Sequence, residues 1–277
     1  MKLFKNVAIV GVGLIGGSIA LGIKKRGLAK KIIGVSRHKK TLLLAKKNKA
    51  IDKGSLDIDI VKDADLIIFA TPVNTILKLA PEISKIIGPN CIVTDVGSTK
   101  LEIVEGLEKI FPNYVGSHPL AGSEKRGIGN AYPDIFKNSL CILTPTKSTN
   151  IRALNQVQRL WQLLGARIKF LTPEGHDKAL SFVSHLPHAV AFSLMETMPG
   201  EHLKFAANGL KDTTRLAASD AELWSDIFLS NSKNLIRTID AFQKNLSSLK
   251  NAVKEKDRSQ LYIILKKAKA KRDSLDC

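Results

Sequence analysis

The stretch Val7-Ala8-Ile9-Val10-Gly11-Val12-Gly13-Leu14-Ile15-Gly16 decides the fold. Its four leading apolar residues predict a buried strand, and the glycines match the G-x-G-x-x-G pattern of a strand-to-helix turn. In this pattern Gly11 allows the tight turn, Gly13 lets a pyrophosphate approach the backbone, and Gly16 lets the helix pack closely on the strand. The N-terminus of that helix would face the phosphates of a dinucleotide.

Further apolar runs continue the pattern of alternating strands and helices. Strong strand predictions cover 32–35, 66–70 and 91–94, weaker ones cover 114–116 and 140–143, and helical stretches include 41–49 and 74–87. Strands alternating with helices predict a parallel sheet with right-handed crossovers. We therefore expect an α/β fold with a doubly wound, Rossmann-type sheet.

The pattern changes after Thr172-Pro173, because no strand-like run recurs. Apolar residues at three- and four-residue spacing predict helices over 174–198, 202–218, 220–246 and 247–272. We expect a boundary near residue 171, with a dinucleotide-binding domain at 1–171 and an all-helical domain at 172–277. The helical domain has more apolar faces than one neighbouring domain can cover, so we expect a homodimer.

Composition excludes several classes of protein. The chain is 44% hydrophobic, and three scattered cysteines (Cys91, Cys141 and Cys277) fit neither a disulfide framework nor a CxxC zinc site. We therefore expect a cytoplasmic protein. The longest uncharged stretch, 7–23, contains five glycines and is shorter than the roughly 20 residues of a membrane span, so no membrane association is expected.

The net charge of +18 is concentrated in residues 1–171, which hold 27 Lys and Arg residues against 12 Asp and Glu residues. Such a basic surface is compatible with nucleic acid or with an anionic ligand. The run from Lys24 to Lys53 has twelve basic residues and no aromatic residue, so it offers no stacking platform for single strands. We expect no nucleic-acid partner, and keep a basic nucleotide- or nucleic-acid-binding protein as the non-enzymatic alternative.

The end of the second predicted strand bears on the choice of nicotinamide cofactor. A fold that binds NAD usually has Asp or Glu about 20 residues after the glycines, where the carboxylate holds the ribose 2′-hydroxyl. Here Ser36 and Arg37 occupy that place. A hydroxyl and a guanidinium can bind a 2′-phosphate, which a carboxylate would repel. We therefore expect NADP, with NAD as the alternative.

Two further strand ends complete the expected cofactor site. Thr71 and Pro72 follow the third predicted strand and Ser98 follows the fourth, and ligands of open parallel sheets bind beyond the carboxyl ends of strands. Ser98 can also be read as the N-cap of the helix that begins near Lys100. The expected cofactor contacts are Gly11, Gly13, Leu14, Ile15, Gly16, Ser36, Arg37, Thr71, Pro72 and Ser98.

Three polar clusters are not explained by folding alone. They are Gly116 to Glu124, Ser184-His185-Leu186-Pro187-His188, and Gly209 to Arg215 with Trp224 nine residues later. Singly, each has a structural explanation, such as a turn, a core histidine pair or a surface ion pair. No spacing typical of metal ligands occurs, so we expect no metal.

Together these clusters resemble the prephenate and arogenate dehydrogenases of tyrosine biosynthesis. The matching elements appear in family order from about residue 6 to 228, and His-Pro-Leu-Ala-Gly and Ser-His-Leu-Pro-His are the specific ones. The resemblance implies a Rossmann domain followed by a helical dimerisation domain. It also implies NAD(P)-dependent oxidative decarboxylation of prephenate to 4-hydroxyphenylpyruvate. Ser36-Arg37 departs from the acid of members that use NAD.

The resemblance also implies roles for individual residues. His118 is expected to be the base that takes the proton of the ring hydroxyl, with Ser98 hydrogen-bonded to the same group. Arg215 is expected to bind a carboxylate with its planar fork. The remaining expected substrate contacts are His185, His188, Glu124 and Trp224.

Rival functions remain open at this point. Arogenate dehydrogenase is the nearest, because arogenate has an amino group where prephenate has the side-chain ketone, and the same base and arginine would serve. A hydroxyacid or imine reductase of the same two-domain shape gives no reason for the clusters around His118 and His188.

Overall fold

The computed structural model describes residues 2–122 and 126–275 of the 277-residue chain. The chain forms two compact units, 1–231 and 232–277. No helix among the described residues is long and apolar enough to cross a membrane. Two of the cysteines, Cys91 and Cys141, are buried free thiols.

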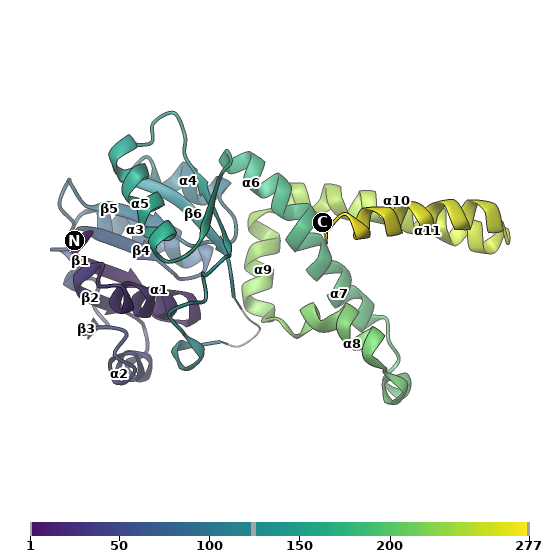
Figure 1. Cartoon of the computed structure of the whole chain (residues 1–277), viewed down its shortest axis with the longest axis horizontal. Coiled ribbons are helices and arrows are strands. Elements are labelled where there is room, and N and C mark those ends of the chain that lie inside the picture. Colours follow the sequence, from purple (N-terminus) through teal and green to yellow (C-terminus); the bar gives the residue numbers. More distant parts are fainter. Residues whose placement is uncertain (1, 123–125, 276–277) are drawn as a thin grey trace. The chain divides into compact units, whose positions relative to one another are not determined.

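The first unit is built on one sheet (Figure 1), whose described strands follow the order β3-β2-β1-β4-β5-β6-β7-β8. Neighbouring strands are parallel except for β6 and β7, which are antiparallel. The central strands are formed by apolar runs that end in turns, and they are buried on both faces. The strands are β1 (Phe4–Val10), β2 (Ala29–Val35), β3 (Lys53–Ser55), β4 (Leu66–Phe69), β5 (Ile92–Asp95), β6 (Tyr114–Leu120), β7 (Leu140–Thr144) and β8 (Arg167–Phe170).

The sequence predicted six of these strands, and the Rossmann-type α/β sheet is confirmed. The prediction was incomplete in two respects. It missed β3 and β8, which are only three and four residues long and carry several polar side chains. It also assumed an entirely parallel sheet, whereas β7 runs antiparallel to β6.

Helices cover both faces of the sheet. One apolar core joins α1 and α5 to one face, and a second core joins α3 and α4 to the other. The helices of this part are α1 (Leu14–Lys25), α2 (Lys39–Lys47), α3 (Val73–Ser84), α4 (Leu101–Leu107) and α5 (Ile151–Leu163), with short 3₁₀ helices at Ile58–Val61 and Ile128–Asn130.

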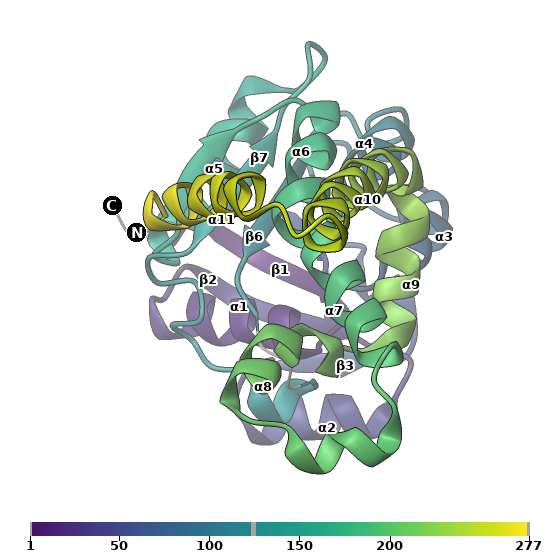
Figure 2. The same ribbon diagram turned by 90° about the vertical axis from the view of Figure 1, so that its right-hand side faces the viewer.

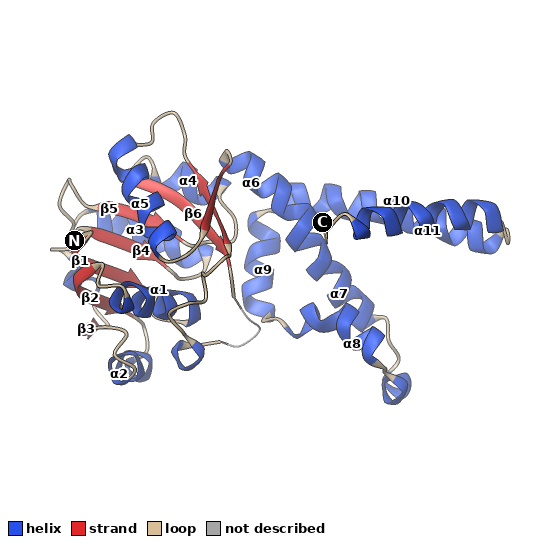
Figure 3. Cartoon of the chain, viewed as in Figure 1, coloured by secondary structure: helices blue, strands red, loops and turns tan. Residues whose placement is uncertain are grey.

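Only helices follow β8 among the described residues (Figure 3). Within the first unit these are α6 (Pro173–Leu180), a π-helical turn (Ser181–His185), α7 (Leu186–Glu196), α8 (Asn208–Thr214) and α9 (Ala221–Ser230), with 3₁₀ helices at Gly200–Phe205 and Arg215–Ala218. Figure 2 shows α7, α8 and α9 of this part of the chain.

The wide π turn lies in the middle of the helix predicted over 174–198. The N–H of Leu186 donates to the carbonyl of Ser181, five residues earlier, and Pro187 follows without an N–H of its own. The single helix predicted over 202–218 is wrong, because α8 occupies only its centre and 3₁₀ turns flank it.

The second unit is a hairpin of two helices, α10 (Ser232–Lys254) and α11 (Arg258–Asp273). The helices predicted over 220–246 and 247–272 therefore had wrong ends. Asn231 separates α9 from α10, and Lys256, with a φ of 55°, marks the turn before α11. Asp257 caps α11 by accepting a hydrogen bond from the backbone N–H of Gln260.

Candidate functional site

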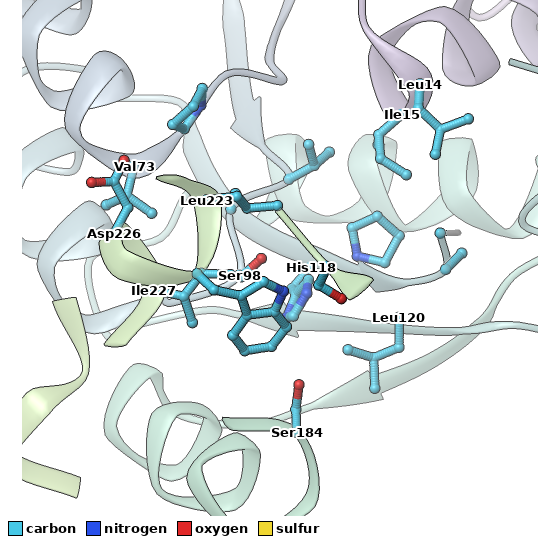
Figure 4. A pocket seen from close by; sticks show the side chains of 18 of the residues that line it. Leu14, Ile15, Val73, Ser98, His118, Leu120, Ser184, Leu223, Asp226 and Ile227 are labelled. Atoms are coloured by element: carbon cyan, nitrogen blue, oxygen red, sulfur yellow. The ribbon is translucent and has the colours of Figure 1, made fainter. Parts of the chain in front are cut away.

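A cavity of about 770 Å³ opens at the carboxyl ends of β1, β4 and β5 and is bounded on its other side by residues of α7 and α9. Figure 4 shows Ser98 and His118 in the middle of this cavity, with Leu14 and Ile15 on one side and Ser184 on another. Of the residues singled out from the sequence, its lining includes Gly13, Leu14, Ile15, Thr71, Pro72, Ser98, His118, His188, Arg215 and Trp224.

The glycine loop is shaped as the pattern predicts. Gly11 has a φ of +102°, and a Cβ atom there would lie 2.6 Å from the carbonyl oxygen of Ala70. A Cβ on Gly16 would lie 2.0 Å from the oxygen of Gly11, so the helix and the turn pack too closely for any side chain. Gly13 is different, because no heavy atom lies within 4 Å of the position that its Cβ would take.

The open backbone at Gly13 makes this end of the cavity suitable for a dinucleotide. The N-terminus of α1 presents backbone N–H groups there, and it carries no acidic residue in its first turn. Thr71 adds a buried hydroxyl with no hydrogen-bond partner among the described residues. A ribose or amide group of a nicotinamide cofactor would supply that partner.

Ser36 and Arg37 do not line the cavity. The Ser36 Oγ accepts a hydrogen bond of 3.2 Å from the N–H of His38, and the Arg37 Nε donates to the His38 Nε2 over 3.1 Å. Both residues follow β2, and Arg37 is exposed. The one acid of the basic run, Asp52, is held elsewhere by Lys24 at 2.6 Å and by the N–H of Ile32 at 2.8 Å.

His118 lies on β6, where its backbone pairs with Ile142 of β7. Its Nδ1 is 2.9 Å from the Nε2 of His176, and no hydrogen bond with another described residue involves its own Nε2. Burial, reinforced by His176, Lys100 and His185, holds the pKa of His118 well below its usual value. The ring is therefore neutral near pH 7, as a general base requires.

Sequence reasoning missed the two residues behind His118. His176 and Asp177 lie in α6, and the Nδ1 of His176 is 2.7 Å from the Oδ1 of Asp177. Both side chains are almost completely buried. An adjacent His-Asp pair in a predicted first helical turn has no distinctive sequence pattern, because its meaning depends on a contact with residues 58 positions away.

Ser98 lines the cavity, and buried polar residues flank it in the sequence. Lys100 forms an ion pair with Asp95, and Asp95 also accepts hydrogen bonds from the N–H of Ser117 and the hydroxyl of Tyr114. The suggestion that Ser98 caps the following helix is wrong. Lys100 is the N-cap residue of α4, and the carboxylate of Asp177 accepts from the first N–H groups instead.

The helical side of the cavity is organised around Trp224. The ring of His188 stacks on it with centroids 3.4 Å apart, and the Nδ1 of His188 is 2.9 Å from the carbonyl oxygen of Ser184. Burial and the nearby charge of Arg215 lower the pKa of His188, although the Ser184 carbonyl opposes this. Arg215 lines the cavity from the 3₁₀ helix after α8.

His185 is not a cavity-lining residue. It is buried, its Nδ1 is 3.1 Å from the Nδ2 of Asn231, and its ring meets the edge of Trp224. Burial lowers the pKa of His185 to about 4. His185 therefore contacts the ring of Trp224 without lining the cavity itself. Glu124 lies outside the described residues.

Asp226 of α9, the N-cap residue Asp220 of that helix and Arg126 were also missed. Arg126 lines the cavity and pairs with Asp220, which also caps α9 by accepting from the N–H of Leu223. Asp226 lines the cavity and accepts a hydrogen bond of 2.8 Å from Asn74 of α3. Within the described residues no cluster of His, Cys, Asp and Glu is arranged to hold a metal ion.

Comparison with known proteins gives matches along nearly the whole chain. Residues 19–170 match the family model described as prephenate dehydrogenase, nucleotide-binding domain. Residues 172–267 match the model described as prephenate dehydrogenase, dimerization domain. A prephenate dehydrogenase of Bacillus subtilis (strain 168) is 37% identical over 98% of this chain and 76% of its own length.

Solved structures agree with these matches. The prephenate dehydrogenase of Aquifex aeolicus, in complex with hydroxyphenyl propionate and NAD+, superposes with a TM-score of 0.93 at 37% identity, covering 98% of both chains. The Synechocystis arogenate dehydrogenase superposes with a TM-score of 0.84 at 29% identity, covering 98% of this chain and 99% of that one. These matches favour a dehydrogenase over the other functions that the sequence left open.

Proposed function

Since the chain belongs to the prephenate dehydrogenase family, we propose that it oxidises and decarboxylates prephenate to 4-hydroxyphenylpyruvate with a nicotinamide dinucleotide. The observation that carries this proposal is the position of His118. Its ring lines the same cavity as Gly13 of the glycine loop. The ring is neutral and is held through Nδ1, so Nε2 is the nitrogen available to a substrate.

The proposed reaction begins at the ring hydroxyl of the substrate. His118 takes the hydroxyl proton on Nε2 as the carbinol carbon loses hydride, and Ser98 donates a hydrogen bond that holds the oxygen in place. A bound nicotinamide ring supplies the acceptor for that hydride. The ring carboxylate then leaves as carbon dioxide, and its bonding electrons complete the aromatic ring and leave a phenolate oxygen, which takes back the proton from Nε2 of His118. Aromatisation makes this step favourable without a metal.

The other end of the substrate needs fixed cationic and hydrogen-bonding groups. We assign Arg215 to a carboxylate, because a guanidinium binds a carboxylate through two parallel hydrogen bonds. His188, stacked on Trp224, is assigned to the side-chain end of the substrate. Glu124 is retained as a substrate-side residue on the basis of the sequence resemblance.

For the cofactor we propose NADP in preference to NAD. The support is the absence of an acid after β2, where Ser36 and the exposed Arg37 lie instead. A charge-assisted hydrogen bond to a 2′-phosphate contributes about 1.5–3 kcal/mol, which corresponds to roughly tenfold to a hundredfold in affinity. The A. aeolicus structure was solved with NAD+, so NAD is the alternative that an experiment must exclude.

Arogenate is the second candidate substrate. The similarity to the Synechocystis arogenate dehydrogenase favours it, because that protein also matches over nearly the whole chain. Arogenate differs from prephenate only by an amino group in place of the side-chain ketone. His188 is neutral, because burial lowers its pKa, and its Nδ1 donates to Ser184, so its Nε2 is an acceptor that can take a hydrogen bond from this ammonium group.

We further propose a cytoplasmic homodimer with domains at 1–171 and 172–277. The match of residues 172–267 to a dimerization domain supports the dimer. Apolar side chains on the helical hairpin offer a surface that a second copy would cover, and the exposed ones include Leu246, Val253, Tyr262, Ile263 and Leu265.

The test is a rate comparison with prephenate and arogenate, each with NADP and NAD at one ionic strength. We expect the highest kcat/KM for prephenate with NADP. The double variant Ser36→Asp/Arg37→Ala should reverse the cofactor order and leave the substrate order unchanged, because neither residue lines the cavity. A clear NAD preference in the unmodified protein would contradict the cofactor assignment, and faster oxidation of arogenate would contradict the substrate.

A further inference from the structure

We propose that His176 and Asp177 are positioning residues that fix His118 as the tautomer with hydrogen on Nδ1 and a free lone pair on Nε2. The inference rests on the proposed function for its catalytic consequence, but the tautomer itself is a property of the protein without substrate. The three side chains form a continuous chain of hydrogen bonds that runs from α6 to β6.

The assignment starts at Asp177, whose carboxylate is nearly completely buried. Its Oδ1 accepts from the N–H of Lys100 at 2.8 Å, and its Oδ2 accepts from the N–H of Leu101 at 3.0 Å. These N–H groups belong to the first turn of α4, where the helix dipole favours negative charge. An ionised carboxylate only accepts hydrogen bonds, so the Nδ1 of His176, 2.7 Å from the Oδ1, must be a donor.

The role of His176 follows from its charge. Burial lowers the pKa of His176, although the hydrogen bond to Asp177 opposes this, so the ring is neutral near pH 7. A neutral imidazole with hydrogen on Nδ1 has a lone pair on Nε2. The Nε2 of His176 therefore accepts, and the Nδ1 of His118, 2.9 Å away, must donate. The remaining nitrogen of His118, Nε2, is left without hydrogen.

The charges around the hydrogen-bonded series His118, His176 and Asp177 are consistent with a neutral His118. The charge of Lys100 acts on His118, but Asp95 pairs with Lys100 in a buried ion pair, and His185 is neutral because burial lowers its pKa to about 4. When His118 takes a proton on Nε2, the bond from its Nδ1 to His176 stays in place. The carboxylate of Asp177 then stabilises the new positive charge through the His176 ring.

A pair of variants at one position separates positioning from packing. His176→Phe removes the acceptor for His118, and His176→Gln supplies an amide oxygen that can accept from Nδ1 while its NH₂ group donates toward Asp177. We expect kcat to fall roughly tenfold to a hundredfold in His176→Phe, as for other outer partners that orient a histidine, with KM within about threefold. His176→Gln should recover most of that loss.

The matched control is Asp65→Asn. The carboxylate of Asp65 also accepts from two backbone N–H groups, those of Lys5 at 2.8 Å and Asn6 at 2.7 Å, but it precedes β4 at the opposite end of the sheet. This variant should lose stability while kcat and the tautomer of His118 stay unchanged.

The direct readout is the two-bond ¹H–¹⁵N spectrum of the imidazole rings, with His118 assigned from the His118→Asn variant. We expect hydrogen on Nδ1 of His118 in the unmodified protein without substrate, and a mixture of tautomers in His176→Phe. Hydrogen on Nε2 in the unmodified protein overturns the proposal, as does equal loss of kcat in His176→Phe and His176→Gln. If prephenate is not oxidised while the Nδ1–H tautomer is observed, the proposed function fails and the tautomer assignment stands.

Discussion

The two sides of the cavity hold their histidines in different ways. On the strand side, His118 of β6 is bonded through Nδ1 to another ring, so its tautomer depends on His176 and on the carboxylate behind it. On the helix side, His188 of α7 is bonded through Nδ1 to the backbone carbonyl of Ser184, which can only accept. The π-helical turn that precedes α7 thus fixes His188 as a donor at Nδ1, and the acceptor there is a backbone carbonyl that does not titrate.

This difference matches the two roles proposed for the histidines, proton transfer for His118 and substrate positioning for His188. A base must change its protonation state during each turnover. His118 is hydrogen-bonded to His176, and His176 to Asp177, whose carboxylate can stabilise the added positive charge. A residue that only positions a substrate gains from rigidity, and His188 is held by a carbonyl and by the face of Trp224. Substitutions on the strand side should therefore act on kcat, and those on the helix side should act on KM.

The largest effect is expected from His118→Asn. The variant loses the imidazole proposed to take the proton of the ring hydroxyl. General-base catalysis typically contributes a factor of about 10²–10⁴ to the rate. We expect kcat to fall by that factor while the dissociation constant of the dinucleotide is unchanged, since the glycine loop is untouched. Steady-state rates and cofactor titration measure the two quantities. A folded variant with near-normal turnover would remove His118 from the role.

A smaller effect is expected from Arg215→Ala, and it should appear in KM. The carboxylate that Arg215 binds is present in both the ground state and the transition state, so its loss weakens binding of both. We expect KM for prephenate to rise roughly tenfold to a hundredfold, with kcat nearly constant. Arg215→Lys should recover little, because an ammonium group lacks the planar fork. An unchanged KM would contradict the assignment.

Local patterns were sufficient to predict six of the eight described strands and the glycine-loop end of the site. The turn at Gly11, the open backbone at Gly13 and the close contact at Gly16 all follow from a short motif next to an apolar strand. Helix ends were predicted less well. The breaks at Asn231 and Lys256 depend on single turn residues within otherwise continuous apolar spacing, and apolar spacing alone does not specify where a helix stops.

The polar chain behind His118 could not be predicted, because it joins residues distant in sequence. His118 meets His176 across 58 positions, and Asp177 meets the first turn of α4 across 77. Each residue has an ordinary explanation in its own segment, and only the tertiary structure brings α6 next to both the start of α4 and His118 of β6. Ser36 and Arg37 are the opposite case, because a local pattern singled them out and the structure places them outside the cavity. Their effect on the choice between NADP and NAD has to be measured.

The pH dependence of kcat/KM for prephenate, measured for the unmodified protein and for His118→Asn, shows whether His118 is the base. The base works only when Nε2 is unprotonated, and burial lowers the pKa of His118, so protonation occurs only well below pH 6.5. We predict a rate that is constant near pH 7 and falls as the pH drops through this lowered pKa, with that acidic limb absent from the variant's residual activity. The same acidic limb in His118→Asn would show that another group is the base.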